Sequence, residues 1–288
     1  MTVWTDLGGG VQVRQSLAFQ MNSVVLLDGA HTVLVDPGVL PSELDDIAAR
    51  VGTASPAEIT LVFTHAHWDH VLGAPWWPGA GTLAHDRFPD DLVRTMEWVN
   101  QEANGLAAKH GEKWPKPFER FRAKERVSGL RFIRLGPWRT VFRDAFGHSP
   151  SQLSLHLPQQ RVLIAADMLS DIEIPTCNAA PSIYRATLAA LEPLVAGGAI
   201  ETIIPGHGTI ARGEAAVRAI LARDIAYLDT LEREVRRLRH EGRGLAEIHQ
   251  SLAGMPDVER HAEFPMRENH EENIQLAYQE LDAVRTGH

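Results

Sequence analysis

The sequence contains a single cysteine, Cys177, among its 288 residues. An internal disulfide needs two thiols, so no disulfide within the chain can stabilise the fold. The same scarcity excludes zinc sites that are built from several cysteine thiolates. A packed thiol is a commoner role for a lone cysteine than a nucleophile. A metal site in this chain would therefore rely on imidazoles and carboxylates.

Basic residues and long apolar runs are also scarce. The chain has 28 Lys and Arg against 37 Asp and Glu, a formal net charge of -9, which repels the phosphate backbone of nucleic acids. No stretch approaches the roughly 18 consecutive apolar residues of a transmembrane helix, and the first residues do not resemble a secretory signal. We therefore expect a cytoplasmic protein that acts on a small molecule and binds neither nucleic acid nor a membrane.

Apolar residues, in contrast, make up 44% of the chain, which is enough for a large core. They form short β-branched runs that end in turn residues, and these runs are interspersed with amphipathic stretches. The expected strands are residues 24–27, 33–35, 59–64, 131–135, 140–142, 152–157, 162–165 and 201–204, and the expected helices are residues 42–51, 183–195, 213–240 and 271–284. This mixture predicts an α/β architecture built in layers.

Two further segments are expected to be helical additions to a single domain of residues 1–288. Residues 86–129 carry tryptophans, phenylalanines and many charges, and we predict a helical insertion there. It would be either a flap over the site or a helical pair that packs against the sheet. Residues 211–288 are predicted to be a helical C-terminal extension, because they begin with a long helix that has an apolar stripe. That stripe could serve the core or the interface of a homodimer, so the oligomeric state stays open.

Histidines provide the strongest signal in the chain. Residues 64–70 read Thr-His-Ala-His-Trp-Asp-His. In an extended segment, His65 and His67 point to the same side and can reach one metal ion, while Asp69 and His70 follow at a turn and can face a second ion. Such a set of imidazoles and carboxylates suits a pair of first-row metal ions that activate water.

Three more candidate ligands stand beside expected strands. His148 precedes one strand within Gly-His-Ser-Pro, Asp167 closes another, and His207 follows a third within Pro-Gly-His-Gly. With the strand before His65, four strand ends are expected to present these ligands at one sheet edge. Asp36 is a candidate for orienting a ligand imidazole, although an aspartate before Pro-Gly can equally form a turn.

The order of these motifs, with Val-Asp-Pro-Gly at residues 35–38, resembles the metallo-β-lactamase fold superfamily. The resemblance implies a four-layered αβ/βα sandwich of two mixed β-sheets flanked by helices, with the metals at one edge. It assigns His65, His67 and His148 to a first metal ion and Asp69, His70 and His207 to a second, with Asp167 bridging the two. The bridging aspartate and Trp68 are similar to the glyoxalase II and lactonase branch rather than to true β-lactamases.

The resemblance implies a hydrolase with two divalent metal ions, of which zinc is favoured and iron or manganese are alternatives. A hydroxide that bridges the metals would attack a small carboxylic ester, lactone or thioester. Asp69 could act as a ligand and as a proton shuttle to the leaving group. Tyr184 could lie near the substrate oxyanion or could simply pack at the start of a helix. Other candidate pocket residues are Ser149, Trp68, Trp76 and Trp77.

Four alternatives to this hydrolase stay open at this point. Nucleases of the same fold cleave phosphodiesters, but the acidic charge of this chain disfavours such a substrate. Di-iron relatives reduce oxygen or oxidise persulfides with similar ligands, and a sequence does not identify its metal. Hydrolysis of β-lactams is the least favoured activity, because the bridging aspartate is generally missing from those enzymes. The metals could also hold together a module that is not catalytic.

Overall fold

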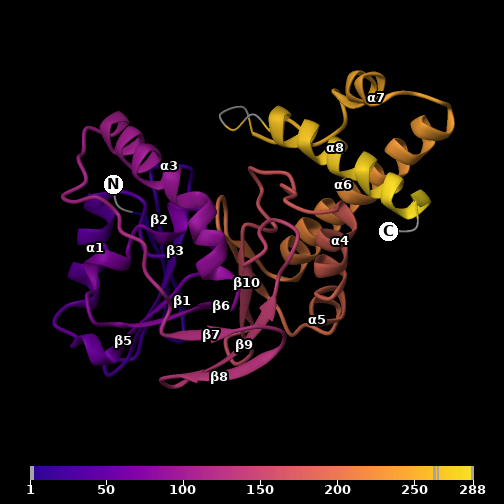
Figure 1. Cartoon of the computed structure of the whole chain (residues 1–288). Coiled ribbons are helices and arrows are strands. Elements are labelled where there is room, and N and C mark those ends of the chain that lie inside the picture. The colour runs from indigo at the N-terminus through magenta and orange to yellow at the C-terminus, as the bar shows by residue number, and fades with distance from the viewer. Residues whose placement is uncertain (1–2, 262–263, 265, 287–288) are drawn as a thin grey trace.

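Two β-sheets lie face to face, with helices on their outer sides, in the computed structural model, which describes residues 3–261, 264 and 266–286 (Figure 1). Within these residues the first sheet has the strand order β1-β2-β3-β4-β5-β6-β7 and the second has β13-β12-β11-β10-β9-β8. The strands of the first sheet are β1 Val3–Gly8, β2 Val11–Gln15, β3 Asn22–Leu27, β4 Thr32–Val35, β5 Ile59–Val62, β6 Gly81–His85 and β7 Glu125–Val127. Those of the second are β8 Arg131–Leu135, β9 Trp138–Asp144, β10 Leu153–Leu157, β11 Val162–Ala166, β12 Thr202–Pro205 and β13 Ala211–Arg212.

Both sheets mix parallel and antiparallel neighbours. The strands from β4 to β7 run parallel to one another, and so do β11 and β12, whereas the other neighbouring strands are antiparallel. Parallel neighbours end at the same side of a sheet, so β11 and β12 both deliver their carboxyl ends to one edge. The prediction of two mixed sheets in an α/β sandwich is confirmed.

The central strands of each sheet are buried on both faces. In β3, Val24 and Leu26 pack in the core between the sheets, whereas Val25 packs in the core under the helices that cover the first sheet. In β11, Ile164 belongs to the core between the sheets and Leu163 to the helical layer on the other side. Burial on both faces explains why these strands are continuous apolar runs instead of alternating ones.

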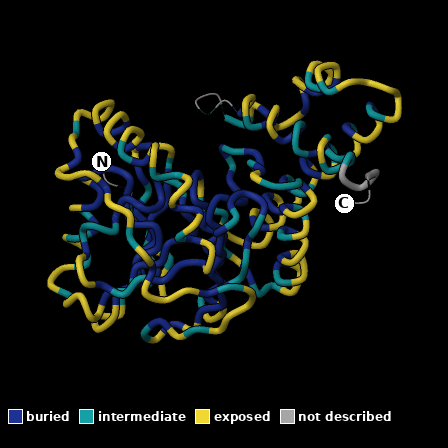
Figure 2. Tube along the Cα trace, viewed as in Figure 1, coloured by how far each residue is buried: buried dark blue, intermediate teal, exposed yellow. Residues whose placement is uncertain are grey.

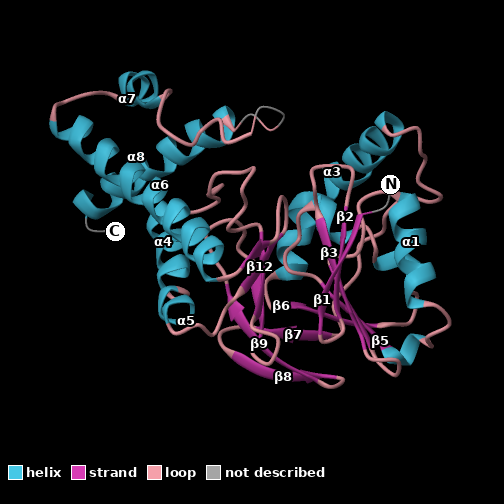
Figure 3. Cartoon of the chain, turned by 180° about the vertical axis from the view of Figure 1, so that it is seen from behind, coloured by secondary structure: helices cyan, strands magenta, loops and turns pink. Residues whose placement is uncertain are grey.

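Helices complete the four layers, with α1 and α3 against the first sheet and α4, α5 and α6 against the second (Figure 3). Their bounds are α1 Pro41–Val51, α3 Phe88–Lys109, α4 Pro181–Ala189, α5 Glu192–Ala196 and α6 Glu214–His240, and the short helices are η1 Pro56–Glu58, α2 Trp68–Val71 and η2 Ala74–Trp76. The last two helices, α7 Leu245–Leu252 and α8 Arg267–Thr286, project from the body. Buried segments are concentrated in the sheets, and exposed ones on the outer helices (Figure 2).

The segment 86–129 is only partly helical, which differs from the expected insertion. It contains one long helix, α3, and ends in β7, which pairs with β6 in the first sheet. Phe88 and Val99 of α3 are buried in the core beneath that sheet, and Phe118 of the following loop joins them. Because its apolar face is part of this core, the segment forms a layer of the sandwich and not a helical pair added to it.

Three smaller differences concern the limits of elements. The expected helix at 183–195 is divided into α4 and α5, with Pro193 in the first turn of α5, where its missing N–H is not needed. The expected extension at 211–288 begins with β13, which pairs with β12. Strands β1, β2 and β6 were not expected, because polar residues interrupt their apolar runs. No helix among the described residues combines the length and the hydropathy that crossing a membrane requires.

Candidate metal centre

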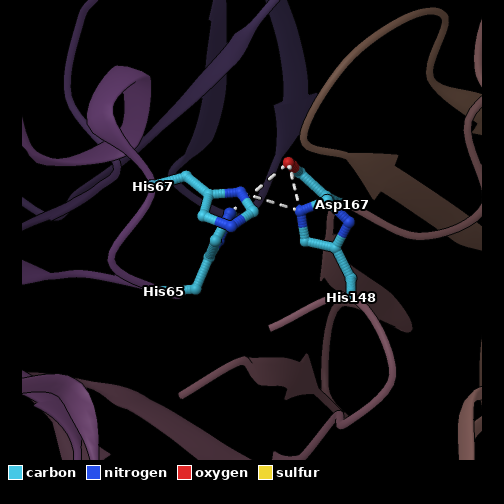
Figure 4. A group of neighbouring side chains, drawn as sticks. All are labelled: His65, His67, His148 and Asp167. Carbon is cyan, nitrogen blue, oxygen red and sulfur yellow. Dashed lines mark hydrogen bonds and ion pairs between the residues drawn. The ribbon is translucent and has the colours of Figure 1, made fainter. Parts of the chain in front are cut away.

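The structure brings the seven candidate ligands together in two neighbouring groups. The first group is His65, His67, His148 and Asp167 (Figure 4), and the second is Asp69, His70 and His207. Within each group the candidate ligand atoms all lie within 4.8 Å of one another. The fold therefore gathers in one place residues that stand far apart along the sequence, from His65 to His207.

The main-chain path explains how residues 64–70 serve both groups. Strand β5 ends at Val62, the chain stays extended at His67, and α2 begins at Trp68. His65 and His67 therefore lie on the extended part, while Asp69 and His70 lie in the first turn of α2. The change from extended to helical backbone places the second pair of side chains in the neighbouring group, with 4.2 Å between the ring centroids of His65 and His70.

The other ligands come from the second sheet, which corrects the expectation of a single sheet edge. His65 follows β5 of the first sheet, whereas Asp167 and His207 follow the parallel strands β11 and β12. His148 lies in the loop between β9 and β10. The expectation was wrong because the apolar runs do not reveal which strands belong to which of the two sheets. The candidate centre lies where the ends of both sheets meet.

Asp167 stands between the two groups. Its Oδ2 atom lies 3.4 Å from Nε2 of His65 and 3.2 Å from Nε2 of His148. Its Oδ1 atom lies 3.2 Å from Nε2 of His70 and 3.7 Å from Nε2 of His207. Each oxygen of one carboxylate thus faces a different group, which is the arrangement that a carboxylate shared by two cations requires.

Hydrogen bonds behind the imidazoles fix their orientation. Nδ1 of His70 donates to Oδ2 of Asp36 over 2.9 Å. Nδ1 of His148 donates to the carbonyl of Thr176 over 3.1 Å, and Nδ1 of His207 donates to the carbonyl of Phe19 over 3.0 Å. A neutral imidazole that donates through Nδ1 keeps its lone pair on Nε2, and in all three residues Nε2 faces the centre.

Asp36 is itself held firmly. Its carboxylate accepts hydrogen bonds from the main-chain N–H and the hydroxyl of Thr64, over 2.8 and 2.5 Å, in addition to the bond from His70. Its backbone lies in the left-handed region, with φ of 46°, so the residue also forms the turn before Pro37. Asp36 therefore forms a turn and also accepts a hydrogen bond from the candidate ligand His70.

Unfavourable backbone conformations gather around the centre. Seven described residues other than glycine have positive φ, and five of them, Phe19, Gln20, Asp36, Ala166 and Leu169, lie close to a candidate ligand or its hydrogen-bond partner. Such conformations cost free energy and persist where the surrounding structure enforces them, often at functional sites.

Gly206 shows how tight the packing around Asp167 is. A Cβ atom on this glycine would lie 1.9 Å from Oδ1 of Asp167. No side chain fits in that space, so glycine lets the strand that carries His207 approach the carboxylate.

Burial and mutual charge set the protonation of the centre when no cation is bound. Burial lowers the pKa of His65 far below its usual value and that of His67 to about 4. Burial also opposes a charge on His207, but the carboxylates of Glu173, Asp167 and Asp69 raise its pKa to about 10. The pKa of Asp167 is held well below its usual range by the nearby imidazoles, against the effect of burial.

Two buried atoms that face the centre show that a cation fits there. Nε2 of His65 and Oδ1 of Asp167 have no hydrogen-bond partner in the described part of the chain. A buried polar atom without a partner is costly, and ligation of a cation would satisfy both atoms. The set of five imidazoles and two carboxylates offers nitrogen and oxygen donors, which suit zinc, iron or manganese.

A family model described as the metallo-beta-lactamase superfamily matches residues 17–207. The chain belongs to this superfamily. The matched stretch contains all seven candidate ligands and ends at His207, so helices α6, α7 and α8 follow the part that the superfamily model describes. No curated protein sequence matches the chain.

Solved structures with low sequence identity share the superfamily fold. The stereoselective inverting sec-alkylsulfatase Pisa1 from Pseudomonas sp. matches 97% of this chain at 16% identity, with a TM-score of 0.70. A metallo-beta-lactamase family protein from Thermus thermophilus matches 96% of this chain and 95% of its own length, at 18% identity and a TM-score of 0.66. A peroxy diiron species of the chemotaxis sensor ODP matches 77% of this chain and 93% of its own, at 18% identity and a TM-score of 0.54. The present chain spans 50% of the length of the sulfatase.

Tyr184 has a different place from the one that the superfamily resemblance suggested. Its side chain is 1% exposed and belongs to the core under the second sheet. The hydroxyl donates to the main-chain carbonyl of Asp167 over 2.9 Å, and burial raises the pKa of the phenol well above its usual value. The phenol thus supports Asp167 from the core, and its hydroxyl is already used.

The other candidate pocket residues differ in how they are placed relative to the centre. The hydroxyl of Ser149 is buried and donates to Asp91 over 2.7 Å. Trp76 donates to Asp45 over 2.9 Å, and Trp77 is packed in the core under the first sheet. Trp68 lies between two candidate ligands and packs edge to face on Phe19, with 6.0 Å between ring centroids. Of these candidates, Trp68 is the one whose position in α2 adjoins the centre.

The sequence analysis missed two residues near the centre. The structure also shows that the lone thiol is not part of the centre. Phe19 supports His207 through a main-chain carbonyl, an interaction that leaves no trace in the residue type. Glu173 interacts electrostatically with ligands of both groups, but it stands outside every motif. Burial raises the pKa of Cys177 to about 12, so this thiol is a packed residue and not a nucleophile.

Proposed function

We propose that the protein is a dinuclear metal-dependent hydrolase that cleaves a small carboxylic ester, lactone or thioester, with zinc as the favoured metal. The observation that carries this proposal is the position of Asp167, whose two carboxylate oxygens face two separate groups of candidate ligands. Membership of the superfamily supports hydrolytic chemistry, although the matching structures include a sulfatase and a diiron protein. A cytoplasmic location and a small-molecule substrate belong to the same proposal.

Two divalent cations at this centre would supply a water nucleophile at neutral pH and would polarise the carbonyl of the substrate. The residues of the chain would hold the ligands in position. The hydrogen bonds from Nδ1 of His70, His148 and His207 keep their Nε2 atoms directed at the centre, where they would hold the cations. Because these hydrogen bonds end on main-chain carbonyls or on the buried Asp36, the imidazoles hold their positions during a reaction.

Asp69 is proposed to act both as a ligand and as the group that moves the proton. Its Oδ2 atom faces Nε2 of His207 over 3.2 Å, which leaves Oδ1 for proton transfer. In the metal-free centre, the imidazoles of His70 and His207 hold the pKa of Asp69 below its usual value against the effect of burial. With cations bound, Oδ1 of the ionised carboxylate would be the atom that receives a proton and returns it to the leaving group.

The test combines metal analysis with a panel of substrates. Purified protein is expected to bind two zinc ions and to hydrolyse at least one aryl ester, lactone or thioester more efficiently than an alkyl sulfate, a phosphodiester or a β-lactam. The variant Asp167→Asn should lose both cation binding and hydrolysis, whereas His110→Gln, at an exposed position, serves as the control. Bound iron together with oxygen consumption and no hydrolysis would refute the proposal. Tight zinc binding without activity on any class of the panel would favour a module that is not catalytic.

A further inference from the structure

The segment that orients His148 has no regular secondary structure of its own. Residues 174–177 form neither a helix, a strand nor a turn, so no ladder of main-chain hydrogen bonds fixes them. Two bonds join this stretch to the loop between β9 and β10. The carbonyl of Thr176 accepts from Nδ1 of His148 over 3.1 Å, and the N–H of Asn178 donates to the carbonyl of Gly147 over 2.7 Å. The place of the Thr176 carbonyl therefore sets the direction of the His148 imidazole.

One side chain of the C-terminal extension holds this segment from its other side. Asn273 in α8 is fully buried. Its Oδ1 atom accepts from the N–H of Cys177 over 2.9 Å, and its Nδ2 atom donates to the carbonyl of Pro175 over 2.7 Å. These two groups lie immediately after and immediately before Thr176. Because a carboxamide carries both a donor and an acceptor, Asn273 pairs with the segment as a residue of a neighbouring parallel strand would.

The amide of Asn273 is itself fixed by further hydrogen bonds. Its Nδ2 atom also donates to the hydroxyl of Tyr227 over 2.9 Å. That hydroxyl donates to Nδ1 of His270 over 2.8 Å, and Nε2 of His270 donates to the carbonyl of Leu252 over 2.9 Å. These bonds connect α6, α7 and α8, which follow the stretch that the superfamily model matches. The extension thus presents the amide to the segment in one orientation.

We propose that Asn273 is a positioning residue for the first group of candidate ligands. It fixes Thr176, whose carbonyl orients His148, and in this way the C-terminal extension sets the affinity of one of the two cation sites. This inference rests on the metal binding that is part of the proposed function. An imidazole whose Nδ1 loses its acceptor is a weaker base and is free to turn, so its hold on a cation weakens.

The second group of candidate ligands offers a comparison within the same molecule. Nδ1 of His70 donates to Asp36, which follows β4, and Nδ1 of His207 donates to the carbonyl of Phe19, which lies between β2 and β3. Neither acceptor belongs to residues 174–177 or to the extension. Loss of the amide of Asn273 is therefore expected to affect one cation site and to spare the other.

The variant Asn273→Leu removes both hydrogen bonds to the segment and keeps a side chain of similar size. Titration of the zinc-loaded protein with a competing chelator should show one zinc ion bound about tenfold more weakly and the other within about twofold of its original affinity. The control Ile274→Ala removes a buried apolar side chain from the neighbouring position of α8 and keeps the amide, so both affinities should be retained. Equal weakening of both ions, or the same loss in the control, would overturn the proposal.

A double-mutant cycle identifies the ion that is affected. In a His148→Ala background no imidazole remains for Thr176 to orient, so adding Asn273→Leu should change zinc binding by less than about twofold. In a His207→Ala background the loss of about tenfold should persist. If Asn273→Leu weakened zinc binding equally in both backgrounds, the amide would act on the fold as a whole and the proposal would be wrong.

Hydrogen exchange tests the same link in the metal-free protein. The N–H of Asn178, which is bonded to Gly147, should exchange about tenfold faster in Asn273→Leu than in Ile274→Ala, because the segment is released from the loop that carries His148. Equal exchange in the two variants would overturn the proposal, whether or not zinc binds. Zinc binding that depends on Asn273 as expected, with no hydrolysis of any ester, would support this inference and contradict the proposed reaction.

Discussion

Oδ2 of Asp36 lies 2.9 Å from Nδ1 of His70, although the two residues are 34 positions apart in the chain. Asp36 follows β4 and His70 lies in α2 after β5, and these two strands are parallel neighbours. Their common direction places the turn after β4 beside the turn after β5. The sheet thus provides the contact that orients the ligand imidazole.

Asp36→Asn should weaken the binding of metal by about 10-fold to 100-fold, because a neutral amide no longer stabilises the orientation and basicity of His70. The change keeps the volume of the side chain, so folding should be affected less than binding. Titration of the zinc-loaded protein with a competing chelator measures the effect. Asp90→Asn, at an exposed position in the first turn of α3, is the matched control. Equal zinc affinity in both variants would show that Asp36 is only a turn residue.

The variant Tyr184→Phe tests whether the hydroxyl of Tyr184 only stabilises the main chain at Asp167 or also takes part in the reaction. Loss of the hydroxyl leaves the buried carbonyl of Asp167 without this hydrogen bond, which should lower the free energy of unfolding by about 1–3 kcal/mol. Chemical denaturation measures that loss. Because the phenol is buried in the core, kcat/KM should fall no more than zinc affinity does. A fall of more than about 100-fold with unchanged stability and metal content would place the hydroxyl at the substrate.

The sequence indicated which residues gather at the candidate centre, and the family resemblance indicated the two-sheet sandwich that gathers them. Residues 64–70 reveal their role through spacing, and His148, Asp167 and His207 stand beside strands whose apolar runs are easy to recognise. The assignment of each strand to one or the other of the two sheets was not predictable, because pairing is decided by contacts between distant residues. Phe19 and Glu173 were missed for a related reason. One acts through its main chain, and the other stands outside every motif, in a loop whose main chain accepts a hydrogen bond from Arg260.

Gly206→Ala should disrupt the centre without any change of a ligand. The added methyl group would lie 1.9 Å from Oδ1 of Asp167, so either the carboxylate or the strand end at His207 must move. We expect zinc affinity and activity to drop together. Gly105→Ala is an informative control, since a Cβ there meets no atom within 4 Å and the residue lies in α3. That variant should gain about 0.5–1 kcal/mol in the free energy of unfolding, because alanine favours a helix more than glycine does. Unchanged zinc affinity in Gly206→Ala would contradict the packing around Asp167.

In the metal-free protein, protons on His70 and His207 should supply the positive charge that metal ions supply when they are bound. Zinc binding should displace these protons. The carboxylates around His207 raise its pKa from 6.5 to about 10, against the effect of burial, and the pKa of His70 is also raised well above 6.5. Since the folded form binds these protons more tightly than the unfolded form, the resulting stability is complete below pH 6.5 and is lost as the pH rises towards about 10.

Chelator-treated protein should accordingly unfold at a lower temperature at pH 9 than at pH 6.5, and His207→Gln should reduce this difference. Zinc binding at pH 8 should release about two protons from His70 and His207 and about one more from the water that the cations would ionise, which calorimetry in buffers of different ionisation enthalpy can measure. His110→Gln, which changes an exposed imidazole, should release as many protons as the unchanged protein. If zinc binding released no protons at pH 8, His70 and His207 would be neutral in the metal-free centre, and the carboxylates would have to be neutralised by another cation.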